Sequence, residues 1–303
     1  MHAEHEKEAG GGKRKEMTWV KLKIFYALIF FQTAFCGCKQ ENRHLNFEWK
    51  AQHYKAKLAF RLPKEVDESS GAIGWTDSTF LTHNDDGAAE LFEVGYDGKL
   101  KGRIPIPMAS NKDWEALTTD GKGTIYIGDV GNNWNRRKDL RIYPYKPGSA
   151  TVDTMSIVYD DQKEWPPTKA GLNFDCEAMF WRRDSIFLVS KNRGRRTVKL
   201  YGVPAKAGCW VAKVLDSVRL EHMVTDAAYD AQKGQLVLAA YGMVYLFGME
   251  ANAGRTSFGR PLKCLRFARS GQAESAWFGK EAADSNGFYV GNEAGKVFRF
   301  EQR

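Results

Sequence analysis

Short apolar runs separated by turn residues dominate the chain from Phe47 onward. The runs are rich in Val, Ile, Tyr, Phe and Trp, and clusters of Gly, Asn and Asp lie between them. Apolar periodicity of the kind that marks an amphipathic helix is hard to find over three successive turns. The pattern is typical of short β-strands joined by tight turns, so we predict an all-β domain.

One motif returns along this β-rich region. It consists of an acidic residue, two small or apolar residues, a turn and an apolar strand, and it begins at Glu115, Glu177, Asp226 and Glu281, with a degenerate copy at Gly71. Each copy continues into a second β-like run. Repeats of about 40 to 60 residues suit the four-stranded blades of a β-propeller. We therefore predict a propeller of five blades, with a sixth blade between Glu115 and Glu177 as the alternative.

The chain beyond Glu281 is too short to complete a blade. Two β-like runs ahead of the first repeat, Leu45–Trp49 and Lys57–Arg61, are expected to join the C-terminal blade. Pairing the two ends of the domain in one blade closes the ring and removes an exposed strand edge, which is the main aggregation hazard of a β-sheet protein.

The N-terminal region has the layout of an export signal. Lys21 and Lys23 precede a short apolar segment, Ile24–Cys36, and a Gly-Cys step follows at Cys38. The segment is too short to span a bilayer. The Gly-Cys step resembles the lipobox of bacterial lipoproteins, which implies lipidation of Cys38. Lipidation of Cys36 and ordinary signal-peptidase cleavage are the alternatives.

This pattern divides the chain into three parts. Residues 1–38 are the predicted signal segment, 39–46 a tether and 47–303 the propeller domain, with Met17 as an alternative start. We expect an exported protein that is lipid-anchored in the bacterial cell envelope, either at the outer membrane or in the periplasm, and that contacts the membrane through its anchor alone.

Composition and short motifs exclude several classes of protein. Aromatic residues make up 13% of the chain, which is far above the level of disordered proteins. The net charge of +8 is spread along the sequence without a zinc-finger or RNA-recognition signature, so no nucleic-acid partner is expected. Cys176, Cys209 and Cys264 form no Cys-x-x-Cys motif. Serine-hydrolase, P-loop and dinucleotide-binding fingerprints are absent from the sequence.

Several motifs carry a family resemblance. A family of secreted, mostly uncharacterised bacterial propellers shows NDSG-like, DWED-like, GD-x-G-x-N and D-x-EA motifs. The chain resembles it at Asn84–Gly87, Asp113–Glu115, Gly128–Asn133 and Asp175–Ala178. The similarity covers Ser70–Pro204 and names no substrate. That family is distantly similar to esterase-like phytase propellers, which implies six blades as a rival to five.

The repeated acids form the candidate site. The first strand of each propeller blade lines the central channel, so residues at one repeat position form a ring. Glu115, Glu177, Asp226 and Glu281 are therefore predicted to converge at the channel mouth. Converging carboxylates repel one another unless they are protonated or balanced by a cation. Ca²⁺, which takes six to eight oxygen ligands, is the metal we expect there.

Other polar residues complete the predicted ligand-binding set. Each belongs to one of the motifs above or lies near a predicted turn. They are Asn84, Asp85, Asp113, Asp129, Asn132, Asp175, Lys191, Arg193 and Asn292.

Four uses of this site stay open. In the first, the acids only cap backbone groups or pair with bases, and the site binds no ligand. The ring binds Ca²⁺ or a polar organic ligand. A metal activates water while Lys191, Arg193, Arg136 and Arg137 hold a phosphate, as in a calcium-dependent phosphoesterase. The loops recognise a glycan or an envelope protein. We favour ligand or partner binding, with the phosphoesterase as the alternative, and we assign no catalytic residue.

Overall fold

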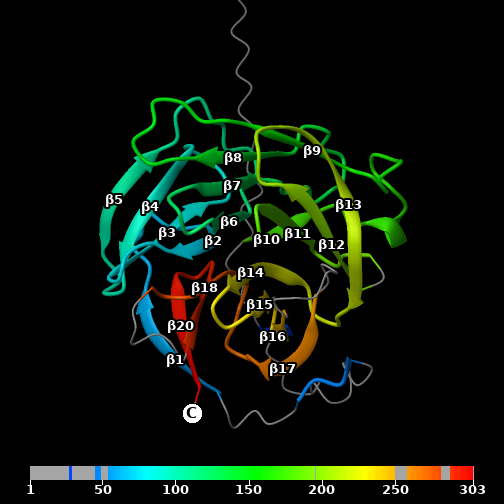
Figure 1. Cartoon of the computed structure of the whole chain (residues 1–303). Coiled ribbons are helices and arrows are strands. Elements are labelled where there is room, and N and C mark those ends of the chain that lie inside the picture. Colours follow the sequence, from blue (N-terminus) through cyan, green and yellow to red (C-terminus); the bar gives the residue numbers. More distant parts are fainter. Residues whose placement is uncertain are drawn as a thin grey trace, which may run out of the picture.

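Twenty β-strands surround a central axis in the computed structural model (Figure 1). The structure describes residues 27–28, 45–48, 54–194, 196–249, 258–280 and 287–302. In Figure 1 the strands radiate as blades from a centre where β2, β6, β10, β14 and β18 meet. The prediction of an all-β propeller is confirmed.

The strands of the described residues fall into five antiparallel groups of four. The innermost strands, which number the blades from 1 to 5, are β2 (Ser69–Gly74), β6 (Ala116–Thr119), β10 (Cys176–Arg182), β14 (Val224–Asp230) and β18 (Ala273–Trp277). The second strands are β3 (Thr79–Asn84), β7 (Ile125–Asp129), β11 (Ser185–Ser190), β15 (Gln235–Ala240) and β19 (Gly287–Asn292). The third strands are β4 (Glu90–Gly95), β8 (Arg141–Tyr145), β12 (Thr197–Pro204), β16 (Met243–Gly248) and β20 (Lys296–Gln302). The outermost strands are β5 (Leu100–Pro105), β9 (Met155–Tyr159), β13 (Gly208–Arg219), β17 (Arg260–Arg266) and β1 (Tyr54–Arg61).

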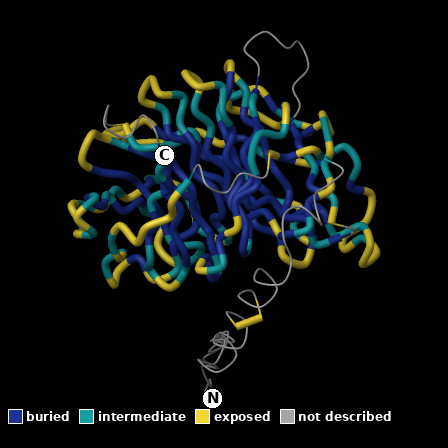
Figure 2. The backbone as a smooth tube through the Cα atoms, turned by 90° about the horizontal axis from the view of Figure 1, so that it is seen from below, coloured by how far each residue is buried: buried dark blue, intermediate teal, exposed yellow. Residues whose placement is uncertain are grey.

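Apolar contacts between neighbouring blades hold the ring together. The inner strands touch one another in the order β2, β6, β10, β14, β18 and back to β2. An apolar cluster lies between each pair of adjacent blades; between blades 5 and 1, for example, Trp277 stacks on Phe80 at 4.5 Å between ring centroids. Both faces of each blade are therefore covered, and the inner strands are buried along most of their length. Figure 2 shows this buried interior.

Blades 2 and 3 are also joined at their outer edges. Strand β13 runs parallel to β9 over five pairs, from Gly208 opposite Met155 to Ala212 opposite Tyr159. Most of β13 is exposed, and a short 3-10 helix, η3 (Lys169–Gly171), lies in the connection before β10. The outer pairing merges the two blades into one eight-stranded sheet.

The two ends of the described domain meet in blade 5. Strand β1 pairs with β20 antiparallel, from Tyr54 opposite Gln302 to Arg61 opposite Lys296, so the expected partner strand Lys57–Arg61 closes the ring. The earlier run behaves differently. Phe47 is buried against Tyr245 and Phe247 of blade 4, so residues 45–48 do not join the C-terminal blade.

The predicted signal falls largely outside the described residues. Met17, Cys36 and Cys38 lie there, as does the segment Ile24–Cys36 apart from residues 27 and 28. Within the described part of the chain, no helix has the length and apolar character that crossing a membrane requires.

Phe47 tests whether the residues ahead of β1 belong to the folded domain. Phe47→Ala is expected to lower the free energy of unfolding by about 3 kcal/mol, because it leaves a cavity between aromatic rings. Leu58→Ala, whose side chain is 52% exposed on β1, is the matched control and should change stability by less than about 0.5 kcal/mol. Urea unfolding measures both, and equal effects would show that Phe47 is not part of the core.

Candidate functional site

A repeated backbone hydrogen bond aligns the blades at one end of the channel. In each blade, a residue just after the second strand donates its N–H to a carbonyl just ahead of the inner strand. The donor and acceptor pairs are Asp85 and Glu68 (3.1 Å), Gly131 and Asp113 (3.1 Å), Lys191 and Asp175 (2.8 Å), Tyr241 and Met223 (3.1 Å), and Glu293 and Gln272 (3.1 Å). Equivalent side chains of the five blades therefore surround one opening.

One residue of each blade lies two positions beyond the acceptor of that bond. We call these the ring residues: Ser70, Glu115, Glu177, Thr225 and Glu274. In blades 3, 4 and 5 the ring residue is the extra, unpaired residue of a strand irregularity. Such bulges change the direction of a side chain, and in these three blades the bulged residue is the one at the channel mouth.

Two of the four predicted ring acids are not ring residues. Asp226 follows Thr225, and its carboxylate accepts hydrogen bonds from the N–H groups of Ala227 (2.7 Å) and Ala276 (2.6 Å), which fastens β14 to β18. A shift of one residue turns a strand side chain to the opposite face. Blade 5 supplies Glu274 from β18, whereas Glu281 lies beyond the end of that strand and outside the described residues.

Acidic side chains dominate the wall of a cavity of about 290 Å³ at this mouth. Its carboxyl groups belong to Glu68, Asp85, Glu115, Glu177, Glu274 and Glu293. Its bases are Lys191 and Arg193, both from blade 3, and its other lining residues are Ser69, Ser70, Asn133, Met223, Tyr241 and Gln272. Of the residues predicted from the sequence, the cavity wall contains Asp85, Glu115, Glu177, Lys191 and Arg193.

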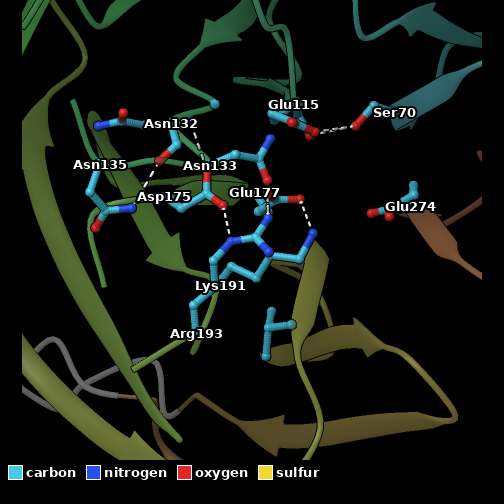
Figure 3. Close-up of polar contacts among 12 residues, drawn as sticks. Ser70, Glu115, Asn132, Asn133, Asn135, Asp175, Glu177, Lys191, Arg193 and Glu274 are labelled. Atoms are coloured by element: carbon cyan, nitrogen blue, oxygen red, sulfur yellow. Dashed lines mark hydrogen bonds and ion pairs between the residues drawn. The ribbon is translucent and has the colours of Figure 1, made fainter. Parts of the chain in front are cut away.

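A chain of polar contacts crosses the mouth from blade 3 to blade 5. Lys191 Nζ donates to Glu177 Oε2 at 2.8 Å and to the Tyr241 hydroxyl at 3.3 Å, and that hydroxyl donates to Glu274 Oε1. Burial alone would lower the pKa of Lys191. The charges of Glu177, Tyr241 and Glu274 raise it by more, so the pKa of Lys191 lies well above its ordinary value. Lys191 therefore stays charged and is committed to these partners (Figure 3).

Arg193 is held in a similar way. Its Nε donates to Asp175 Oδ2 at 2.6 Å, and its Nη2 donates to Asn133 and lies 3.6 Å from Glu177 Oε1. The other Asp175 oxygen accepts the backbone N–H of Asn132 at 2.7 Å. Figure 3 shows Asp175 and Arg193 facing each other beside the Glu177–Lys191 pair. Blade 3 thus supplies both bases of the mouth and uses them on its own acids.

The side of the mouth formed by blades 1 and 5 supplies no base of its own within the described residues. Glu68, Asp85, Glu274 and Glu293 line it, and Glu274 accepts a hydrogen bond from Tyr241 of blade 4. Burial and the charge of Glu68 raise the pKa of Asp85 to about 7. Burial and the charge of Glu274 raise the pKa of Glu293 to about 8. These carboxyls therefore hold protons near neutral pH unless another positive charge replaces them.

Glu115 lies between these two sides. Its Oε2 accepts a hydrogen bond from Ser70 Oγ at 2.9 Å, and its side chain is 7% exposed. Burial raises its pKa well above the ordinary value, and the charges of Glu177 and Asp113 add to the shift. At the position equivalent to Asp85 and Lys191, blade 2 has Gly131, where a Cβ would lie 2.4 Å from Asp113 Cγ.

Several predicted ligand-binding residues have structural partners instead. Asn132 Oδ1 accepts the N–H groups of Arg136 and Arg137, and Asn292 bonds Ser270 O and Lys296 N, so both organise turns. Asn84 bonds Asp67, and Asp129 pairs with Arg137 at 2.8 Å. These residues, together with Asp113 and Asp175, lie behind the cavity wall.

The predicted metal ring consists of Glu115, Glu177, Asp226 and Glu281, and Glu281 lies outside the described residues. Within the described part of the chain, one group of acids has carboxylate oxygens within 4.8 Å of one another, and it comprises Glu68, Asp85 and Asp86 in blade 1. Glu115, Glu177 and Asp226 do not belong to this group.

Four residues of the cavity wall were not predicted from the sequence: Glu68, Tyr241, Glu274 and Glu293. Glu274 could have been found, because Ala273-Glu274-Ser275-Ala276 follows the repeat motif more closely than the copy at Glu281. Tyr241 and Glu293 share a position with Asp85 and Lys191, directly after a second strand. Their dissimilar residue types hide that equivalence in the sequence.

A larger cavity, of about 400 Å³, opens among the other ends of the inner strands. Small and apolar residues such as Ala227, Leu117 and Trp181 line it. Its acid Asp230 pairs with Lys233 at 3.2 Å. This cavity therefore lacks the unbalanced charge of the acidic mouth.

Comparisons with known proteins add only distant similarity. No family model matches the chain, and no curated protein matches it. Virginiamycin B lyase from Staphylococcus aureus is 11% identical with a TM-score of 0.41, covering 80% of this chain and 69% of the lyase. A PQQ-bound aldose sugar dehydrogenase from Streptomyces coelicolor is 10% identical with a TM-score of 0.47, covering 82% and 98%. A streptogramin B lyase is 8% identical with a TM-score of 0.42, covering 83% and 99%.

Asp113 gives the site a measurable pH dependence. Burial and the charge of Asp175 raise the pKa of Asp113 from 3.8 to about 6. Because the pKa of Asp113 is higher in the folded protein than in the unfolded chain, protonation of Asp113 stabilises the fold. This stabilisation is fully present below the pKa of the unfolded chain and is lost as the pH rises through about 6. Asp113→Asn should therefore melt close to the wild type at about pH 4 and above it at about pH 8. An unchanged difference between the two proteins at both pH values would contradict this environment.

Proposed function

We propose that this protein is a binding protein whose ligand is a small cation held at the acidic channel mouth. One observation carries the proposal. Glu274 Oε2 is buried in the cavity wall and has no hydrogen-bond partner within the described part of the chain. A buried carboxylate oxygen without a partner costs stability, and a bound positive charge removes that cost.

The charge of the wall supports the same conclusion. Six carboxyl groups face the cavity against two bases. Both bases already form ion pairs, Lys191 with Glu177 at 2.8 Å and Arg193 with Asp175 at 2.6 Å. A cluster of one sign in a concave, low-dielectric site concentrates counter-ions. An anionic or neutral ligand would leave the excess of carboxyl groups unbalanced.

The phosphoesterase alternative receives less support. It requires Lys191, Arg193, Arg136 and Arg137 to hold a phosphate. Three of these four bases already form ion pairs: Lys191 with Glu177, Arg193 with Asp175 and Arg137 with Asp129. A phosphate at the mouth would have to displace these pairs and would lie against several carboxylates. We therefore favour cation binding over phosphate chemistry.

We also propose that the protein is exported and lipid-anchored in the bacterial cell envelope. The basic, apolar and Gly-Cys pattern ending at Cys38 supports this proposal. An anchored propeller would present its channel mouth to solutes of the envelope.

Thermal unfolding with a panel of solutes tests cation binding. We expect Ca²⁺, Mg²⁺ or a small organic cation such as putrescine to raise the melting temperature by about 5 °C at about 100 times its Kd, because it binds only the folded state. Glucose at the same concentration should have no effect.

Two variants make this test specific. Glu274→Gln should weaken the shift, because it removes a carboxylate from the wall. Glu301→Gln, which removes an acid paired with Lys57 on the outer strand β20, should leave the shift unchanged. A panel in which no cation raises the melting temperature would overturn the proposed function.

Radiolabelled palmitate tests the anchor. Cys38→Ala should abolish label incorporation in the producing cells and release the protein into the soluble fraction, whereas Cys36→Ala should keep the label. Incorporation that persists in Cys38→Ala would place the modification elsewhere.

A further inference from the structure

The side of the mouth between blades 1 and 5 has the composition of a hard-metal site. Glu68 and Asp85 come from blade 1, and Glu274 and Glu293 come from blade 5. Both pairs line the same cavity, and the inner strands of the two blades, β18 and β2, are neighbours in the ring. The cavity wall contains no His or Cys side chain. Carboxylate oxygen sets of this kind select Ca²⁺, Mg²⁺ or Mn²⁺ over softer ions.

The geometry of blade 1 brings oxygen atoms together. Carboxylate oxygens of Glu68, Asp85 and Asp86 lie within 4.8 Å of one another. Asp85 Oδ1 is buried, and no hydrogen-bond partner for it lies among the residues that the structure describes. Carboxylates this close repel one another, and a bound cation would relieve that repulsion.

Blade 5 supplies an independent observation. Glu274 is 6% exposed; its Oε1 accepts from Tyr241, and its Oε2 has no partner in the described ranges. In Figure 3 the Glu274 carboxylate points away from its strand into the space that Ser70 and Glu115 also face. Glu293 lines the same cavity wall. Gln272 donates to Glu293 Oε1 at 2.8 Å.

We infer that Glu68, Asp85, Glu274 and Glu293 together bind one hard divalent cation of the Ca²⁺ class. The inference rests on the proposed function and narrows its ligand from small cations in general to this class. Ca²⁺ suits the site better than Mg²⁺, because Ca²⁺ accepts six to eight oxygens in flexible geometry, whereas Mg²⁺ demands a near-ideal octahedron. A cavity of about 290 Å³ leaves room for water molecules as the remaining ligands.

Isothermal titration calorimetry of the full-length protein, stripped with EDTA and dialysed, tests the inference. The probes are CaCl₂, MgCl₂ and putrescine. We expect saturable Ca²⁺ binding with one site per chain, weaker Mg²⁺ binding and still weaker putrescine binding. Glu274→Gln and Glu68→Gln should each weaken Ca²⁺ binding about tenfold or more, since each removes a charged ligand.

Controls separate coordination from general charge. Glu90→Gln removes an acid that pairs with Arg103 at 2.8 Å on outer strands and should leave Ca²⁺ affinity unchanged. Glu68 lies at the end of the inner strand rather than within it, so Glu68→Gln tests the site even if Glu274→Gln fails to fold, which circular dichroism would show.

The outcomes distinguish this inference from the proposed function. Ca²⁺ binding that both site variants retain would overturn the four-carboxylate site. Putrescine binding without Ca²⁺ binding would overturn the divalent-metal inference and leave cation binding standing. Titrations in which none of the three cations binds would overturn both.

Discussion

Five inner strands that converge on one axis are the constraint on which the rest of this structure depends. Because β18 contacts β2 as the other inner strands contact their neighbours, side chains at one repeat position are forced to meet. The backbone hydrogen bond that recurs in every blade keeps those positions aligned. An acid that would be harmless on a single sheet becomes, when repeated around the ring, a cluster of like charges in a buried mouth. Pairing of β1 with β20 keeps the ring closed around it.

The blades respond to that constraint unequally. Blade 3 balances its own acids with Lys191 and Arg193, and blade 2 places Gly131 where the other blades place a larger side chain. Blade 4 contributes Tyr241, which links the Lys191 side to Glu274. Blades 1 and 5 bring acids without a base. Acidic groups are therefore in excess on the side of blades 1 and 5, and a bound cation would stabilise the protein most on that side.

The sequence predicted the architecture better than it predicted the site. Apolar runs and turn residues lead directly to the propeller, and the motifs at Glu115 and Glu177 lie in register with the ring. The motif at Asp226 misleads by one residue, because blade 4 has Thr225 at the ring position and an acid directly after it. The parallel pairing of β13 with β9 and the packing of Phe47 on blade 4 depend on tertiary contacts, so no local sequence pattern predicts them.

The central claim is that the blade 1 and 5 acids are unbalanced whereas those of blade 3 are balanced. The most direct measurement compares the melting temperatures of Glu274→Gln and Glu177→Gln in EDTA at about pH 8.5. The account predicts that Glu274→Gln melts above the wild type, because one buried charge is removed from an uncompensated group. Glu177→Gln should melt well below the wild type and lose about 3 kcal/mol of unfolding free energy, because Lys191 loses its carboxylate partner. A Glu274→Gln protein destabilised as much as Glu177→Gln would contradict the account.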